Sequence, residues 1–272
     1  MNTLISSIAL IFLFACSSDK DVGFGGGGID DSGGSGGLPE TESIWSVDDR
    51  GLDLISYNGL LYASTQAGGA IWSYDPETEV ADRIAWDLGD LQAIAFNDDE
   101  IYASFTDSHV EGWVATIEPP KGVDVIASKT DSGTLFRRPA GLAFGNNDEL
   151  YVLDIKDESI WKIDSNGSVS TFSSVGGVAI FYFEGSVYVG GDDGIFEVTS
   201  NSSTLIDSRP AFGFEVVGGA LVASSTYDFV FEVGGEQIAT GDLARPGAMA
   251  TLNGVLYIMD TVTGKVSAVD LN

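Results

Sequence analysis

Arginine is the residue type whose spacing in this chain most clearly favours specific chemistry. The 272 residues include 41 Asp and Glu but only 12 Lys and Arg, so the formal net charge is −29. Four arginines nevertheless precede short apolar runs at one recurring position, and Arg137 adjoins one of them; the four are Arg50, Arg138, Arg209 and Arg245. A guanidinium group offers a planar fork of donors that fits a carboxylate or a phosphate. Gathered in the fold, these arginines and the nearby Tyr227 would form a site for a small anion.

A structural role for the same arginines is also open. Three of them are followed by a proline, Pro139, Pro210 or Pro246, and proline stiffens a turn. Each guanidinium group could bond loop carbonyls or pair with an acid. Asp154 and Asp260, which end two apolar runs, are the acids that we expect to lie beside the arginines.

Asp154 and Asp260 also suggest the binding of a metal ion. Ca²⁺ takes six to eight oxygen ligands, and carboxylates are prominent among them. Other polar residues within the apolar runs, Asp53, Gln92 and Glu215, form no matching set, and no Asp-x-Asp-x-Asp-Gly loop occurs. Calcium at Asp154 and Asp260 is therefore one hypothesis, and no other cofactor is indicated.

Other catalytic and binding chemistry has little support in the sequence. The single histidine, His109, stands in a polar loop, and a zinc site or a Ser-His-Asp triad would depend on it alone. No Gly-x-Ser-x-Gly elbow or P-loop is present. The large excess of acid argues against binding to nucleic acid or to an anionic membrane surface by charge.

The elements that must position these residues form a repeat. The unit is clearest from Arg138 to Ser174, where four short runs of β-branched and aromatic residues are separated by Gly, Asn and Asp. Such runs are typical of hairpin strands. The second-strand signature, an aliphatic residue usually followed by Tyr, occurs six times, at Leu61, Ile101, Leu150, Val187, Leu221 and Leu256. Repeated four-stranded units of this length predict an all-β fold, a six-bladed β-propeller with antiparallel blades.

The two ends of the repeat region predict how the ring closes. The sixth unit stops after its third strand, near Asn272, whereas Ile44 to Val47 precedes the first unit and looks like a fourth strand. We therefore expect Ile44–Val47 to complete the last blade. A strand at that place would remove two exposed sheet edges.

One stretch resembles a known family of propellers. The pattern Pro139-Ala140-Gly141-Leu142-Ala143-Phe144, followed by Leu150-Tyr151-Val152-Leu153-Asp154, looks like the NHL repeat, and residues 43–272 resemble six-bladed propellers of the NHL-repeat and gluconolactonase-like (TolB-like) superfamily. In such propellers, loops that enter first strands share a face with loops that leave second strands. The resemblance implies a ligand site at that mouth, and the gluconolactonase-like enzymes hold a metal there. These families include both enzymes and binding modules.

The first 42 residues predict where in the cell the protein is located. The apolar run Leu4–Phe14 is too short to span a bilayer and fits the core of a signal peptide. Leu13-Phe14-Ala15-Cys16 resembles a bacterial lipobox, in which the cysteine becomes lipidated. We therefore expect residues 1–15 to be a lipoprotein signal peptide and residues 16–42, rich in Gly, Ser and Asp, to be a flexible tether.

Taken together, these patterns favour a lipid-anchored protein of the bacterial cell envelope, at the outer membrane, with a monomeric propeller at residues 43–272. We expect the propeller to be a binding or scaffold module, rather than an enzyme, for an envelope protein or a small anionic ligand. The alternative is a Ca²⁺-dependent hydrolase or lactonase of the gluconolactonase-like type.

Overall fold

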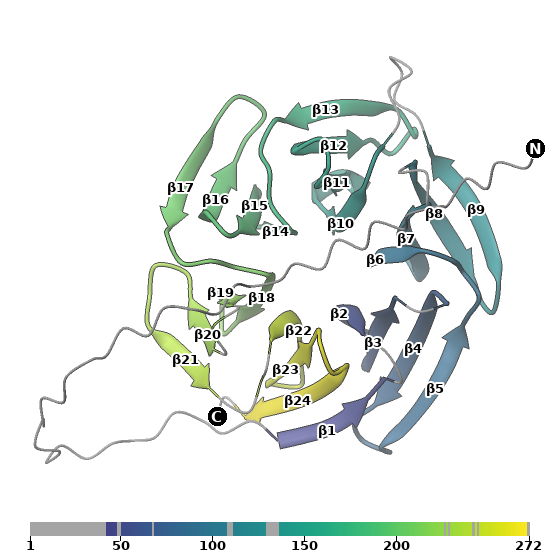
Figure 1. The fold of residues 1–272 in the computed structure, drawn as a ribbon, viewed down its shortest axis with the longest axis vertical. Coiled ribbons are helices and arrows are strands. Elements are labelled where there is room, and N and C mark those ends of the chain that lie inside the picture. The colour runs from purple at the N-terminus through teal and green to yellow at the C-terminus, as the bar shows by residue number, and fades with distance from the viewer. Residues whose placement is uncertain are drawn as a thin grey trace, which may run out of the picture. The chain divides into compact units, whose positions relative to one another are not determined.

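The computed structural model describes residues 42–47, 50–66, 68–107, 111–128, 136–225, 227, 229–240, 243 and 245–270. These residues form six four-stranded antiparallel sheets arranged as blades around a central axis (Figure 1). One 3₁₀ turn, Asn146–Asp148, is the sole helical element in this part of the chain, and no helix there is long and apolar enough to cross a membrane. The predicted six-bladed, all-β propeller is confirmed.

Each of the first five blades uses four consecutive strands, from the centre outward. Blade 1 contains β2 Gly51–Tyr57, β3 Leu60–Thr65, β4 Ala70–Asp75 and β5 Val80–Ala85. Blade 2 contains β6 Leu91–Asn97, β7 Glu100–Thr106, β8 Gly112–Glu118 and β9 Gly122–Ala127. Blade 3 contains β10 Pro139–Phe144, β11 Leu150–Asp154, β12 Ser159–Ile163 and β13 Val169–Ser173.

The remaining blades continue the pattern until the last one, which borrows a strand. Blade 4 contains β14 Ala179–Phe183, β15 Ser186–Gly191, β16 Gly194–Val198 and β17 Ser203–Asp207. Blade 5 contains β18 Gly213–Val217, β19 Ala220–Ser224, β20 Phe229–Glu232 and β21 Gln237–Thr240. Blade 6 contains β22 Pro246–Leu252, β23 Val255–Asp260 and β24 Lys265–Asp270, with β1 Glu42–Ser46 outermost.

Strand β1 closes the ring as the sequence predicted. It pairs antiparallel with β24, where Ser43 lies opposite Ser267 and Trp45 opposite Val266. The Trp45 ring stacks on Tyr74 of blade 1 with a centroid distance of 5.1 Å. The N-terminal strand therefore binds the last blade by its backbone and the first blade by its side chains.

Apolar contact between neighbouring blades forms the core. The described residues form six hydrophobic clusters, and each joins side chains from two adjacent blades. The cluster around Leu54, Leu61, Ala250 and Met259 joins blade 1 to blade 6. Alternating side chains of a radial sheet point to both neighbours, so each blade buries both of its faces only when the ring is complete.

Tight hairpins connect first and second strands in five blades. Asn58 and Gly59 have φ of 47° and 81°, and Asn253 and Gly254 have φ of 53° and 80°. Positive φ at both central residues is the type I′ turn that matches the twist of the flanking strands, and Asn-Gly adopts it readily. In these five blades the short turns fix the register between the first and second strands.

Candidate functional site

Backbone hydrogen bonds hold four residues at equivalent positions in their blades, just before the first strand; this is called the entry position. The carbonyl oxygens of Arg50, Asp90, Arg138 and Arg245 accept N–H bonds at 3.0–3.1 Å from the end of the second strand of the same blade. The donor is the last residue of that strand in blade 2 and the residue after it in blades 1, 3 and 6. This contact joins the loop into each first strand to the loop out of each second strand. The predicted entry position is thus present in blades 1, 2, 3 and 6, and three of its four residues are arginine.

Blade 5 departs from the predicted alignment by one residue. Phe214 in blade 5 and Leu142 in blade 3 are equivalent, because they pair with the equivalent residues Ala223 and Val152. The residue four positions before Phe214 is Pro210. Arg138 holds the same place relative to Leu142. Arg209 therefore lies one residue ahead of the entry position, because Phe212 adds a residue between the Arg-Pro pair and the strand.

The side chain of Arg209 is committed to contacts within the fold. Its Nε and Nη2 atoms bond the carboxylate of Asp207, and Nη2 also donates to the carbonyl oxygen of Glu232 at 2.9 Å. The guanidinium group lies 3.9 Å from the ring centroid of Phe231. Arg209 thus joins the last strand of blade 4 to blade 5.

Arg50, Arg138 and Arg245 have exposed side chains with no hydrogen bond or ion pair to any residue of the described chain. The guanidinium group of Arg245 lies 5.7 Å from the ring centroid of Phe212. Arg137 differs, since its Nη1 lies 3.3 Å from Asp157 Oδ1 in an exposed ion pair. Three guanidinium groups on the entry face are therefore exposed and unpaired within the described part of the chain.

Tyr227 is the other predicted ligand residue. Its side chain is 63% exposed, and its ring stacks on Phe229 with a centroid distance of 6.5 Å. It stands between β19 and β20, in the loop that leaves the second strand of blade 5. Cys16 and His109 lie outside the described residues.

Asp154 and Asp260 have the same structural role in two blades. Asp154 is fully buried; its Oδ2 accepts the Arg137 N–H at 2.7 Å, and its Oδ1 accepts the N–H groups of Arg138, Lys156 and Asp157. Asp260 accepts the N–H groups of Arg245, Val262 and Thr263. The acids are thus next to the arginines, as predicted, but they bind the arginine backbone rather than the guanidinium groups.

These bonds explain the electrostatics of Asp260 and bear on the calcium hypothesis. Burial alone would raise the pKa of Asp260, but the N–H donors of Thr263, Arg245 and Val262 hold it below its usual value. A carboxylate has about four lone-pair positions, and four N–H groups bond to Asp154. Within the described chain, no group of three or more His, Cys, Asp or Glu side chains could hold a metal, so calcium at this pair stays a prediction without geometric support.

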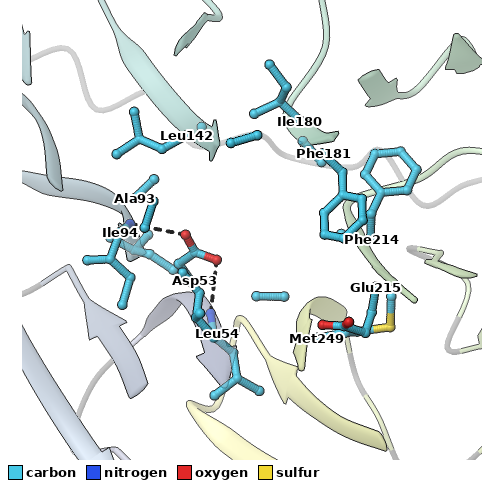
Figure 2. Close-up of a pocket in the computed structure, with 18 of the residues that line it drawn as sticks. Asp53, Leu54, Ala93, Ile94, Leu142, Ile180, Phe181, Phe214, Glu215 and Met249 are labelled. Atoms are coloured by element: carbon cyan, nitrogen blue, oxygen red, sulfur yellow. Dashed lines mark hydrogen bonds between the residues drawn. The ribbon is translucent and has the colours of Figure 1, made fainter. Parts of the chain in front are cut away.

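A cavity of about 330 Å³ lies at the centre of the ring (Figure 2). All six inner strands line it, mostly with small, aliphatic and aromatic side chains; examples are Ala93, Leu142, Ile180, Phe214 and Met249. A cavity of this size that combines apolar side chains with a few convergent polar groups is typical of a small-molecule site. Phe212 also lines it, so Arg245 stands at its edge.

Two carboxyl groups enter this cavity, Asp53 from β2 and Glu215 from β18. Asp53 accepts the N–H of Leu54 at 3.0 Å and the N–H of Ile94, in blade 2, at 3.1 Å. Glu215 accepts the N–H of Val216 at 2.9 Å. Burial raises the pKa of both carboxyl groups to about 7, although these N–H donors act in the opposite direction.

The sequence contains a signal for this pair, namely an acid at a position where the other repeats carry a different type of residue. In register with Asp53, the other inner strands carry only small residues: Ala93, Gly141, Ala179, Gly213 and Ala248. Repeats are aligned by what their members share, whereas Asp53 and Glu215 are exceptions to the pattern.

Comparison with known proteins supports the fold. No family model matches the chain, and no curated protein matches its sequence. Among solved structures, a putative gluconolactonase is 14% identical with a TM-score of 0.69, covering 85% of this chain and 92% of that one. A luciferin-regenerating enzyme is 12% identical with a TM-score of 0.67, covering 85% and 95%. The PQQ-bound aldose sugar dehydrogenase of Streptomyces coelicolor is 12% identical with a TM-score of 0.64, covering 84% and 96%. At these identities the likeness is one of fold.

Proposed function

We propose that the propeller is a binding module that captures a small organic anion on its entry face. The observation that carries this proposal is the state of Arg50, Arg138 and Arg245. All three are exposed beside inner strands, and none has a side-chain hydrogen bond or ion pair with the described residues, although the chain has more than three acids for each cation.

The net charge makes this arrangement informative. At −29, the field of the whole chain repels anions, so an anion binds only where local cations outweigh that field. Arg245 and Arg50 enter adjacent blades 6 and 1, and Arg138 enters blade 3. Hydrogen bonds between guanidinium and carboxylate are charge-assisted and can be bidentate, so two or three such contacts favour a di- or tricarboxylate.

The proposed setting is the surface of a bacterial cell envelope, with the propeller held by a lipid on Cys16. Cys16→Ser would then move the protein from the detergent phase to the aqueous phase in a phase-partition assay. An unchanged distribution would refute the anchor without bearing on the ligand. An envelope protein that presents carboxylates is the other ligand class that the sequence leaves open.

A thermal-shift screen of the full chain tests the proposal. We expect citrate, succinate and phosphate, compared with NaCl at equal ionic strength, to raise the Tm, because a ligand that binds only the folded state stabilises it. Equal ionic strength matters because salt alone stabilises so acidic a protein. The triple variant Arg50→Ala, Arg138→Ala, Arg245→Ala should keep its Tm in NaCl and lose the anion-specific rise.

Two controls make the screen decisive. Arg137→Ala removes an exposed guanidinium group that is already paired with Asp157, and it should leave the anion effect unchanged. Millimolar Ca²⁺ and a chelator form the second control, because a shift with Ca²⁺ alone would favour the hydrolase alternative. A large fall in Tm for the triple variant without any anion would show that the arginines are structural.

A further inference from the structure

The central cavity holds a charge arrangement that the anion proposal does not use. Asp53 and Glu215 project from two walls of the cavity, on blades 1 and 5 (Figure 2). The other polar side chains that line it are Ser56, Gln92 and Tyr182, and none of the described residues in its lining is Lys, Arg or His. Neither carboxyl group therefore has a cationic partner in the cavity.

The propeller fold does not require these acids. The five blades other than blade 1 have Ala or Gly in register with Asp53. The five blades other than blade 5 have Ile55, Ala95, Ala143, Phe181 and Ala250 in register with Glu215. Asp53 and Glu215 are partly buried, and removing part of a carboxylate from water without a counter-charge is unfavourable. Two such groups at positions where small or apolar residues suffice point to a ligand that compensates them.

Each acid is also held in place by the backbone of two blades. Asp53 bonds the N–H groups of Leu54 in blade 1 and Ile94 in blade 2. Glu215 accepts the N–H of Val216 in blade 5, and the nearby backbone of Thr251 in blade 6 acts to lower its pKa. Carboxyl groups fixed in this way need little reordering when a ligand arrives.

Aromatic rings complete the cavity. Phe181 and Phe214 line it, and their ring centroids are 6.4 Å apart; Phe212 and Tyr182 add two more rings. The face of an aromatic ring attracts a cation and also packs against apolar groups. The small side chains between them leave a volume of about 330 Å³, enough for a small organic molecule.

We propose that this cavity binds a small organic amine, whose ammonium group pairs with Asp53 and Glu215 while its apolar part packs against Phe181 and Phe214. The site adjoins the arginine face, because Phe212 lines the cavity and Arg245 lies beside Phe212. The two acids disfavour an anion inside the cavity. The negative field of the chain also attracts the cation.

Proton linkage distinguishes an amine from an uncharged ligand. Burial raises the pKa of both carboxyl groups to about 7, and an ammonium group beside them favours their ionised form. Tyr182 is the one other titratable side chain among the lining residues that the structure describes. Amine binding should therefore release protons near neutral pH, and the affinity should fall as the pH drops and the carboxyl groups become protonated.

The experiment titrates the full chain with benzylamine and with benzyl alcohol, its uncharged counterpart, by calorimetry. We expect saturable binding of benzylamine, proton release measured as a difference between two buffers, and an affinity at least tenfold lower at pH about 5.5 than at pH about 8. Benzyl alcohol should bind at least tenfold more weakly. Asp53→Asn and Glu215→Gln should each weaken benzylamine at least tenfold, whereas Asp124→Asn, a change of an exposed acid on β9, should have no effect.

Several results would overturn the proposal. These are equal binding of the amine and the alcohol, amine binding that does not depend on pH, or amine affinity unchanged in both cavity variants. Calcium that displaces benzylamine stoichiometrically would identify a metal site instead. The pH dependence of the unmodified chain gives an answer even if a cavity variant fails to fold.

Discussion

At the scale of single residues, the buried aspartates of the described chain act as acceptors for backbone N–H groups. Asp154 accepts hydrogen bonds from four backbone N–H groups around the entry to blade 3. Asp260 accepts three at the equivalent place in blade 6. Both are buried. They fix the loops from which Arg138 and Arg245 project, so they position the proposed anion site without touching the ligand.

Replacing Asp154 by Asn should therefore destabilise the fold. The amide keeps one acceptor oxygen and sets an NH₂ group against N–H donors. Each buried group left unsatisfied costs about 1–3 kcal/mol, and we expect the free energy of unfolding in urea to fall by about 2 kcal/mol or more. The exposed Asp124→Asn should change it by less than about 0.5 kcal/mol. A small effect at Asp154 would mean that its bonds contribute little.

Asp207 gives a prediction about acid sensitivity. The side chain of Arg209, more than any other cause, lowers the pKa of Asp207 to about 2. A carboxyl group whose pKa is lower in the folded state stabilises the fold above its unfolded pKa and ceases to do so as pH falls through the folded value. Wild type should thus lose more stability than Asp207→Asn between pH about 5 and about 2, in urea unfolding at each pH. Equal losses would contradict the importance of this pair.

The candidate site was only partly predictable at this scale. The entry arginines followed from a repeated position, and Asp154 and Asp260 were expected beside them. That Arg209 lies one residue out of register depends on how Phe212 is accommodated, which a pattern of residue types does not specify. Asp53 and Glu215 were visible as isolated acids, but only the ring brings two positions 162 residues apart in the chain into one cavity.

At the scale of elements, the strand assignment followed from the alternation of apolar residues and from the turn residues. The repeat of an aliphatic residue and Tyr marks second strands because the aliphatic side chain packs into the core between two blades. The pairing of β1 with β24 was predictable because Ile44–Val47 resembles a fourth strand and the sixth unit lacks one.

The closing strand should contribute strongly to stability. Trp45 is 8% exposed and packs between blades 6 and 1. Trp45→Ala should lower the free energy of unfolding by about 3–5 kcal/mol, the usual range for a large aromatic residue removed from a core. Trp86→Ala is the matched control, because Trp86 is partly exposed and its ring lies near the cationic groups of Arg83 and Lys121. Similar losses in the two variants would contradict the role of β1 as the closing element.

At the scale of the whole molecule, the net charge of −29 affects the stability of the fold. Self-repulsion of like charges destabilises a compact state, and salt screens it over about 10 Å at 0.1 M. The Tm should therefore rise when NaCl increases from about 20 mM to about 500 mM. A constant or falling Tm would mean that the acids are spaced widely enough for repulsion to be negligible.

The central claim is that Arg50, Arg138 and Arg245 bind a small organic anion, and calorimetric titration with citrate at constant ionic strength tests it most directly. We predict saturable binding to the full chain, at least tenfold weaker binding by the triple alanine variant, and unchanged binding by Arg137→Ala. Equal citrate affinity in all three proteins, with the variants folded, would contradict the claim. So would the absence of binding to the unmodified chain.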